Sequence, residues 1–309
     1  MNAAWDYHAG GGQFKNLNVF TEALDKRYGP SRSAEEYARK AQVMAYEGER
    51  AMFEAFGRNK YTATGVIQWM LNNAWPGMIW HLYDWYLRPG GGYFGAKKAC
   101  ERLHVQYSYD DRSIVVVNSF YEAFANMKVV VAVYNLDMSV KFSREMKMDA
   151  EPDSSTRVFK LPEIEGLSDT WFLSLKLEDP SDDLVSENFY WLSTAPETLE
   201  WEKGTWYTTP TKTFANYNAL ESLPPVTLKV TAKNGDGTTT VSVSNPTKSL
   251  AFAIRLKVKS EVDGEEILPV LWEDNYFSLT PGESREITAT YAPLAKGKAV
   301  AEVTGWNVK

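Results

Sequence analysis

The stretch HVQYSYDDRSIVVVNSF, residues 104–120, decides the fold of most of the chain, because the side-chain period changes to two here. A period of two is typical of β-strands with one face buried. Seven strand-like runs follow one another from this point to residue 193, separated by turns rich in Asp, Asn, Pro and Gly. Their number and spacing predict an antiparallel, immunoglobulin-like β-sandwich over residues 103–194.

A second set of strand-like runs begins after Pro224 and Pro225. The stretch VTLKVTAKNGDGTTTVSVSN, residues 226–245, predicts a hairpin, because its NGDG turn supplies residues that tolerate positive φ. The runs FAIRLKVKS, FSLTPGESREITATY and AVAEVTGWN complete a second immunoglobulin-like sandwich over residues 225–309. Residues 195–224, rich in Pro, Thr and Trp, are predicted to be a linker.

Helical patterns dominate the residues before position 103. Ser33 followed by Glu36 forms a capping box, and apolar side chains recur behind it at three- and four-residue spacing until Gly57 and Asn59. This pattern predicts one long amphipathic helix. A shorter helix, over residues 19–28, is expected to precede it.

One apolar run interrupts these helices. The run GVIQWMLN, residues 65–72, is apolar without alternation, which is typical of a parallel strand buried on both faces. A further helix is expected behind Gly90, Gly91 and Gly92, which we interpret as flexible backbone before that helix. The order of helix, buried strand, loop and helix indicates the α/β class for residues 1–102.

The composition excludes several classes of function. The 309 residues include 33 Lys and Arg against 40 Asp and Glu, a formal net charge of -7. Nucleic-acid binding is not expected, because it needs clustered cations. No stretch approaches the roughly 18 uninterrupted apolar residues of a membrane span. The start MNAAWDYHAGGG lacks the basic and apolar parts of a signal peptide, so we expect no export signal in this chain.

Aromatic side chains are densest over residues 69–93, directly after the predicted strand. In α/β sheets and barrels, the loops beyond the carboxyl ends of the strands form the ligand site. A flat aromatic ring beside an amide suits a sugar, whose ring has apolar C–H faces and a polar rim. Two interpretations stay open: a sugar-binding surface, or a seal between the α/β part and the sandwich. For Trp80 and Trp85 the seal is favoured.

Other kinds of site find little support. The histidines His8, His81 and His104 stand at no metal-ligand spacing, and no phosphate or dinucleotide motif is present, so we expect no metal and no cofactor. Acidic side chains such as Glu47 and Glu49 lie on predicted helices, and no spacing selects a catalytic pair among them. We interpret them as parts of solvated helix faces.

Five segments carry a resemblance to a known family: RYGPSRSAEEYARKAQVMAYEGERAMFEAF, TGVIQWMLNNAWPGMIWHLYDWYLRPGGGYFGAKKA, LHVQYSYDDRSIVVVN, SENFYWLS and LPVLWEDNYFSLTPGESREITATY. In this order they resemble the C-terminal part of a glycoside hydrolase family 2 enzyme, nearest to the exo-β-D-glucosaminidases and their β-mannosidase relatives. The resemblance covers nearly the whole chain. It implies a multidomain fold, in which the C-terminal remnant of a (β/α)8 barrel is followed by the two immunoglobulin-like sandwiches.

The resemblance also implies where the active site lies. It makes residues 65–72 the eighth barrel strand, and because a barrel needs about 250 residues, residues 1–102 hold only its last part. Both catalytic carboxyl groups of the family lie on earlier strands, so no catalytic residue is assigned in this chain. The resemblance places Trp69 on the floor of the subsite for the cleaved sugar. Asn72 and Trp75 are expected to line the same pocket.

The implied function is that of the C-terminal portion of a retaining exo-β-glycosidase that hydrolyses β-linked glucosamine from chitosan-type oligosaccharides. The expected partners are the oligosaccharide and the N-terminal domains of the same enzyme, without which the chain is expected to be inactive. Two alternatives remain: a non-catalytic glycan-binding or scaffold module, and a portion of a β-mannosidase or endo-β-mannosidase. The intact enzyme is expected to be extracellular or periplasmic, because polymeric substrates lie outside the cell.

Overall fold

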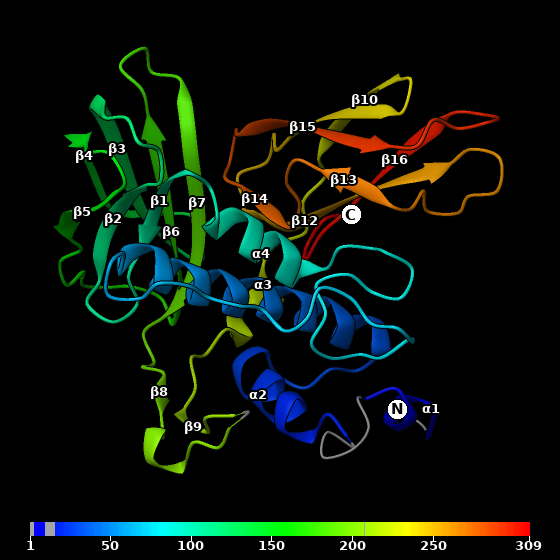
Figure 1. Cartoon of the computed structure of the whole chain (residues 1–309), viewed down its shortest axis with the longest axis horizontal. Coiled ribbons are helices and arrows are strands. Elements are labelled where there is room, and N and C mark those ends of the chain that lie inside the picture. The colour runs from blue at the N-terminus through cyan, green and yellow to red at the C-terminus, as the bar shows by residue number, and fades with distance from the viewer. Residues whose placement is uncertain (1–2, 10–15, 207) are drawn as a thin grey trace.

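A computed structural model describes residues 3–9, 16–206 and 208–309 of the chain. Two β-sandwiches stand next to each other, and helices run beneath both (Figure 1). The long helix α3 (Ala34–Arg58) extends from below the first sandwich to below the second, with α4 (Gly91–Ala99) between it and the strands (Figure 1). The described chain is therefore rich in β-structure, as the sequence predicts.

The first sandwich contains the seven predicted strands. One sheet has the order β1 (Leu103–Tyr107), β2 (Ser113–Asn118) and β5 (Ser154–Lys160). The other sheet has the order β4 (Val140–Ala150), β3 (Phe124–Asn135), β6 (Thr170–Glu178) and β7 (Leu184–Ser193). Neighbouring strands are antiparallel in both sheets. The immunoglobulin-like prediction is confirmed here.

Alternation along the strands builds the core of this sandwich. On β3 the side chains of Val129, Val131 and Val133 are fully buried, whereas those between them are partly exposed. The three valines belong to one apolar cluster with Val105 and Ile114 of the other sheet. Burying one side chain of this size contributes ~1.5–3 kcal/mol, so this cluster holds the two sheets together.

The second sandwich follows the same principle. One sheet has the order β10 (Lys229–Gly235), β11 (Thr238–Ser244), β15 (Ser284–Tyr291) and β13 (Val270–Trp272). The other has the order β14 (Phe277–Leu279), β12 (Ala251–Ser260) and β16 (Ala299–Thr304). The predicted hairpin is confirmed. Its turn contains Gly237 at a φ of +67°, where a Cβ atom would lie 2.7 Å from the carbonyl oxygen of Tyr291.

Short strands are missing from the sequence-based prediction, because three residues or fewer show no period. Strand β13 is one of them. In the predicted linker, β8 (Thr198–Leu199) pairs with β9 (Thr211–Thr213), accompanied by the 3₁₀ turns η2 (Trp201–Lys203) and η3 (Asn218–Ser222). The linker thus contains a folded hairpin that extends below the first sandwich (Figure 1).

The helices begin and end close to the predicted residues. The short helix α1 (Ala3–Tyr7) is followed by α2 (Asn18–Tyr28) and α3. The hydroxyl oxygen of Ser33 accepts a hydrogen bond from the backbone N–H of Glu36 at 3.1 Å, which confirms the predicted N-cap of α3. Asn59 is the C-cap residue of α3, so this helix also stops where the sequence predicts.

Glycines let α4 approach α3 closely. A Cβ atom at Gly91 or Gly95 would lie less than 3.0 Å from the backbone of α3, at Gln42 and Tyr46 respectively. The two glycines are four residues apart and so lie on one face of α4. The interpretation of Gly91 and Gly92 as flexible backbone is wrong, because both are buried residues of the helix itself.

The helices and both sandwiches share an apolar core. The ring centroid of Trp191 on β7 lies 5.1 Å from that of Phe252 on β12. The indole N–H of Trp191 donates to the hydroxyl of Tyr28 on α2 at 3.0 Å. Tyr46 of α3 and Phe94 of α4 belong to the same cluster. The helical part therefore packs on both sandwiches.

The parallel strand predicted over residues 65–72 is not formed. Residues 65–71 are outside every described strand, and Asn72 makes only an isolated bridge with Tyr83. The apolar side chains of this segment face solvent, since Ile67 is 92% exposed and Trp69 is 71% exposed. A parallel strand needs neighbours that pair with its N–H and C=O groups. In the described residues only the end of this segment pairs, through hydrogen bonds of Met70 and Leu71 with residues 80–83.

Candidate functional site

Residues 60–90 connect α3 to α4 and form a segment that we call the aromatic loop. It carries all three predicted sugar contacts. The backbone N–H of Met70 donates to the carbonyl oxygen of Trp80 at 2.5 Å, and that of Tyr83 donates to Leu71 at 2.8 Å. The chain around residue 70 therefore lies beside the chain around residue 82. The turn between them is closed at its base by these hydrogen bonds.

Charged side chains attach the aromatic loop to the second sandwich. The Oδ1 atom of Asp84 accepts hydrogen bonds from the backbone N–H groups of Tyr86 and Arg88, at 2.8 and 2.9 Å. The guanidinium of Arg88 donates to Oδ2 of Asp84 at 2.8 Å and to Oε2 of Glu266 at 2.7 Å. Glu266 lies in the loop between β12 and β13, so the end of the aromatic loop is fixed to that domain.

The three predicted sugar contacts have accessible side chains. Trp69 and Asn72 are exposed, and Trp75 is 39% exposed. No contact among the described residues joins these three side chains to one another. The structure therefore brings Trp69, Asn72 and Trp75 onto one loop but does not enclose them in one pocket.

Asn73 and His81 lie inside the aromatic loop and were not singled out from the sequence as partners. The side-chain Nδ2 atom of buried Asn73 lies 2.6 Å from Nδ1 of His81. This contact joins the two sides of the turn that carries Trp75. Their spacing of eight residues matches no local pattern, so only the folded loop reveals the pair.

The side chains of Trp80 and Trp85, for which a sealing role is predicted, are 40% and 48% exposed. Buried Trp191 and Trp306, which come from the sandwiches, belong to the core shared by the helices and the sandwiches. The aromatic loop therefore exposes the indoles of Trp80 and Trp85 in addition to those of the predicted site residues Trp69 and Trp75.

The interpretation of Glu47 as part of a solvated face is wrong. Its carboxylate accepts hydrogen bonds from the hydroxyls of Tyr217 at 2.9 Å and Tyr28 at 3.3 Å. Burial raises the pKa of Glu47 to about 7, although the hydrogen bond from Tyr217 acts in the opposite direction. Burial also raises the pKa of Glu49 to about 7. Both acids lie on parts of α3 that pack against other elements. The spacing of polar residues along a helix does not show whether a polar position faces solvent or another element.

A buried polar cluster joins α3 to the first sandwich. The Oε1 atom of Glu54 accepts hydrogen bonds from Tyr190 at 2.8 Å and Asn188 at 2.6 Å, and lies 3.0 Å from Nε2 of His104. Burial lowers the pKa of His104, but its hydrogen bonds to two carboxylates outweigh burial and raise it overall. The buried guanidinium of Arg50 donates to Asn188 and lies over the ring of Tyr190. The cluster is closed to solvent and links α3 to β1 and β7.

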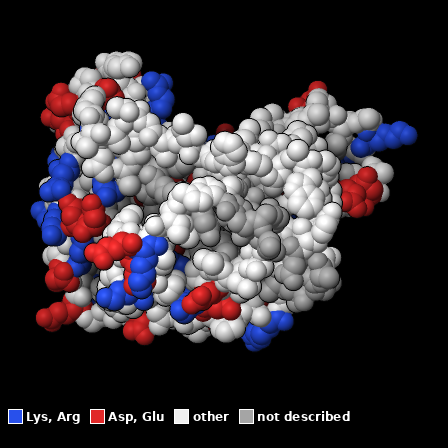
Figure 2. Space-filling view, turned by 60° about the horizontal axis from the view of Figure 1, so that its bottom comes forward, with Lys and Arg blue, Asp and Glu red and all other residues white. Residues whose placement is uncertain are grey.

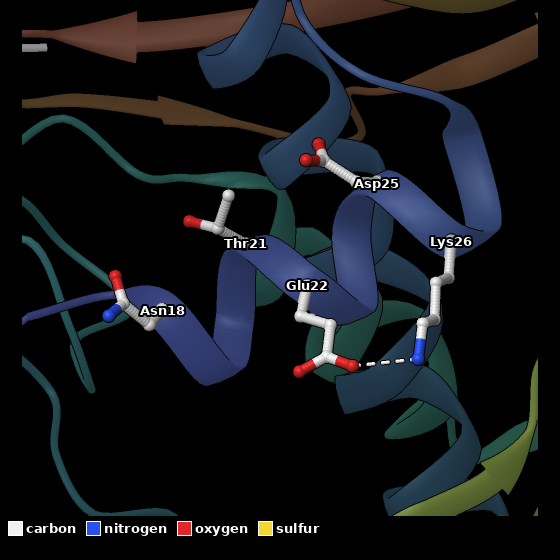
Figure 3. Close-up of a pocket in the computed structure, with 5 residues that line it drawn as sticks. All are labelled: Asn18, Thr21, Glu22, Asp25 and Lys26. Atoms are coloured by element: carbon white, nitrogen blue, oxygen red, sulfur yellow. Dashed lines mark hydrogen bonds and ion pairs between the residues drawn. The ribbon is translucent and has the colours of Figure 1, made fainter.

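An open hollow of about 530 Å³ lies on the surface of α2. It is lined by Asn18, Thr21, Glu22, Asp25 and Lys26 (Figure 3). Glu22 and Lys26 turn toward each other and form an ion pair at 2.7 Å, while Asp25 points away from that pair (Figure 3). All the lining side chains come from one helix, so they do not converge on a ligand as the groups of a binding pocket do.

The surface is unevenly charged. On the face shown in Figure 2, charged side chains gather along the margins, and uncharged residues cover much of the middle. Among the residues that the structure describes, no group of three His, Cys, Asp or Glu side chains is placed to hold a metal ion. No helix in the described ranges is both long and apolar enough to cross a membrane.

Two family models match the sandwiches. The model of the mannosidase Ig/CBM-like domain matches residues 110–195. The model of the exo-β-D-glucosaminidase Ig-fold domain matches residues 206–308. The two sandwiches are thus of the kind found in these glycosidases.

Individual relatives extend the match to the helical part. The chain is 42% identical over 312 residues to an exo-β-D-glucosaminidase of Streptomyces avermitilis, covering 95% of this chain and 34% of the relative. It is 40% identical over 323 residues to an exo-β-D-glucosaminidase of Amycolatopsis orientalis, covering 99% of this chain and 31% of the relative. It therefore spans about a third of the length of these curated relatives.

A solved structure agrees with this match. The crystal structure of the Amycolatopsis orientalis exo-chitosanase CsxA superposes on the chain with a TM-score of 0.90 at 38% identity. The alignment covers 98% of this chain and 37% of that one. Sequence and structure thus agree over the helices, the aromatic loop and both sandwiches, and over nearly its whole length the chain corresponds to the C-terminal part of the exo-β-D-glucosaminidases of glycoside hydrolase family 2.

Proposed function

We propose that this chain is the C-terminal part of a retaining exo-β-glycosidase that releases β-linked glucosamine from chitosan-type oligosaccharides. The observation that carries the proposal is the 42% identity, over nearly the whole chain, to an enzyme named for this activity. A mannoside substrate is the second candidate, because the first sandwich matches a domain model named for mannosidases. Glucosamine is preferred, since over nearly the whole chain the identity is 42% to an exo-β-D-glucosaminidase and only 25% to a mannosylglycoprotein endo-β-mannosidase.

We further propose that residues 65–72 form the last strand of a (β/α)8 barrel when the rest of the enzyme is present. The segment has the apolar composition of a strand buried on both faces, yet Ile67, Trp69 and Leu71 are exposed in this chain. The partner would be the N-terminal domains of the same enzyme.

The catalytic acid and nucleophile are proposed to lie on those N-terminal domains. A retaining glycosidase needs two carboxyl groups about 5–5.5 Å apart that both reach the sugar. In this chain the carboxylates of Glu47 and Glu54 are enclosed by tyrosine hydroxyls and amides. Asp84, on the aromatic loop itself, is engaged by Arg88 and two backbone N–H groups. The chain alone is therefore proposed to be inactive.

The proposed role of the aromatic loop is to bind the sugar. The exposed indoles of Trp69 and Trp75 would stack on the C–H faces of a pyranose ring. The side-chain amide of Asn72 would bond a hydroxyl or amino group through its donor and acceptor atoms. These contacts orient the substrate, and none of them transfers a proton.

The test uses the longer gene product that contains this chain. We expect a higher kcat/KM for the nitrophenyl β-D-glucosaminide than for the β-D-mannoside. Trp69→Ala should lower kcat/KM by about 30-fold or more, because a buried aromatic contact is worth about 2 kcal/mol or more. Tyr121→Ala is the control, since Tyr121 is exposed in the turn before β3 and should change kcat/KM by less than about twofold.

Other outcomes select among the remaining functions. Preference for the mannoside would support a β-mannosidase. Binding of glucosamine oligomers without turnover of either substrate would support a glycan-binding module. Turnover by the 309-residue chain alone would contradict the proposed location of the catalytic carboxylates. The whole enzyme is proposed to act outside the cytoplasm, because chitosan-type polymers lie outside the cell.

A further inference from the structure

Trp75 of the aromatic loop is covered on one side by the N-terminal segment. The imidazole of His8 is stacked on the indole of Trp75, with ring centroids 5.3 Å apart and ring planes at 26°. The ring of Tyr7 and the same indole form a T-shaped pair, with centroids 5.5 Å apart and ring planes at 88°. Tyr7 ends α1, and His8 follows it directly. Tyr7 and His8, which are far from Trp75 in the sequence, thus pack against the indole of this proposed sugar contact.

Hydrogen bonds hold His8 against the turn after Trp75. The Nδ1 atom of His8 lies 2.6 Å from the carbonyl oxygen of Pro76, so the Nδ1–H group is the donor of this bond. The backbone N–H of Met78 donates to the carbonyl oxygen of His8 at 2.8 Å. The imidazole is therefore fixed at its ring and at its backbone. It cannot turn away from Trp75 without losing the bond to Pro76.

The stacked imidazole covers one face of the indole, and the ring of Tyr7 stands almost perpendicular to the indole plane. Trp75 keeps 39% of its surface exposed despite the contacts with His8 and Tyr7. A sugar ring that stacks on an indole needs one face. The arrangement is therefore suited to a layered complex of imidazole, indole and sugar ring.

We propose that His8 is a positioning residue for the sugar subsite, because it orients Trp75 so that the exposed indole face meets the glucosamine ring. This inference rests on the proposed function, which assigns Trp75 to that subsite. His8 touches no reacting atom. Because His8 already fixes the indole in the free protein, Trp75 loses little conformational entropy when the sugar binds. The free-energy cost of binding is lower for this reason.

The experiment follows the indole N–H signal of Trp75 by NMR in the 309-residue chain, with the assignment made by Trp75→Phe. His8→Ala removes both the stack and the bond to Pro76, whereas His8→Phe keeps an aromatic ring in the stack. Val19→Ala is the control, since Val19 is an exposed residue near the start of α2. The signal of exposed Trp201, on the β8–β9 hairpin, serves as the internal reference.

We expect His8→Ala to move the Trp75 signal while the Trp201 signal stays in place. The β-1,4-linked trimer of glucosamine should then bind about five- to tenfold more weakly, as measured from the Trp75 shift, because an aromatic pair is worth about 1 kcal/mol. His8→Phe should recover affinity to within about twofold of the original chain. Val19→Ala should change neither signal nor affinity.

The inference is overturned if His8→Ala leaves the Trp75 signal unchanged, or if His8→Phe binds the trimer as weakly as His8→Ala. Thermal unfolding of each variant shows whether the fold is kept, and His8→Phe retains the test if His8→Ala is unfolded. A Trp75 signal that depends on His8 but does not respond to the trimer would show that His8 fixes the indole and would contradict the assignment of Trp75 to the sugar subsite. The failure of the contact and the failure of the subsite assignment are therefore distinguishable.

Discussion

Gly95 of α4 lies directly against the backbone carbonyl of Tyr46 on α3, closer than any side chain at position 95 allows. A Cβ atom there would fall less than 3.0 Å from that carbonyl group. Because backbone cannot retreat as a flexible side chain does, the two helices must separate to admit even one methyl group. The contact lies beside Phe94, in the core that joins the helices to the sandwiches.

Gly95→Ala is therefore expected to destabilise the chain by about 1–3 kcal/mol, the usual cost of overpacking a core. The matched control is Gly48→Ala on α3, where nothing lies within 4 Å of the new Cβ atom. That substitution should stabilise the chain by about 0.5–1 kcal/mol, because alanine is a better helix former. Urea unfolding measures both, and equal effects of the two substitutions would contradict the close approach.

The buried cluster around Glu54 predicts a larger effect. Glu54→Ala leaves Arg50 and the hydroxyl of Tyr190 buried without their acidic neighbour. Removing one member of a buried charged set costs about 3–5 kcal/mol. Glu145→Ala, an exposed change on β4, should alter the free energy of unfolding by less than about 0.5 kcal/mol. A loss below 1 kcal/mol for Glu54→Ala would show that the cluster does not stabilise the junction.

Glu47 predicts a pH dependence of stability. Burial raises its pKa to about 7 in the fold, from an ordinary value of 4.5. The protonated form is thus favoured on folding, so this stability is complete below pH 4.5 and is lost as the pH rises through 7. Glu47→Gln, which keeps a neutral side chain at every pH, should gain about 2.5 kcal/mol over the original chain between pH 5 and pH 8.

Glu22→Gln is the control for that measurement, because Glu22 forms only an exposed ion pair with Lys26. Its difference from the original chain should stay within about 1 kcal/mol at both pH values. Urea unfolding at pH 5 and pH 8 supplies the data. A Glu47→Gln variant whose advantage does not grow with pH would mean that Glu47 is ionised without penalty in the fold.

The exposed apolar segment around Ile67 predicts self-association of the isolated chain. Exposed apolar segments with unpaired backbone promote contacts between copies. Ile67→Lys should shift the chain toward monomer in sedimentation velocity experiments. Val140→Lys, a similarly exposed position on β4, should leave the distribution unchanged. The same distribution for all three proteins would contradict a role of this segment in association.

The elements whose shape is set by local chemistry were predictable from the sequence. Ser33 caps α3 because its hydroxyl accepts a hydrogen bond from the backbone N–H of Glu36, three residues later. This spacing can be recognised in the sequence. The strands of both sandwiches show their burial by alternation. By contrast, residues 65–72 have the composition of a buried strand, yet only the end of this run pairs, with residues 80–83, and no strand is formed. The composition of a segment predicts its preference for a strand, but the strand forms only where a neighbouring segment pairs with it.

The environment of the candidate site was less predictable. Trp69, Asn72 and Trp75 were assigned from a resemblance, and their roles stay predictions until substrate binding is measured. The contact between His8 and Trp75 joins positions far apart in sequence, and no local period marks it. Burial of Glu47 likewise depends on Tyr217, which arrives from the segment between the two sandwiches.

The ion pair between Arg88 and Glu266 links the aromatic loop to a domain encoded far downstream. A gene shortened before the second sandwich would release this loop even though every residue of the loop remained. The two halves of the pair are therefore expected to be inherited together. When the second sandwich is exchanged between related enzymes, the aromatic loop should stay attached only where the incoming sandwich supplies an acid at the position of Glu266.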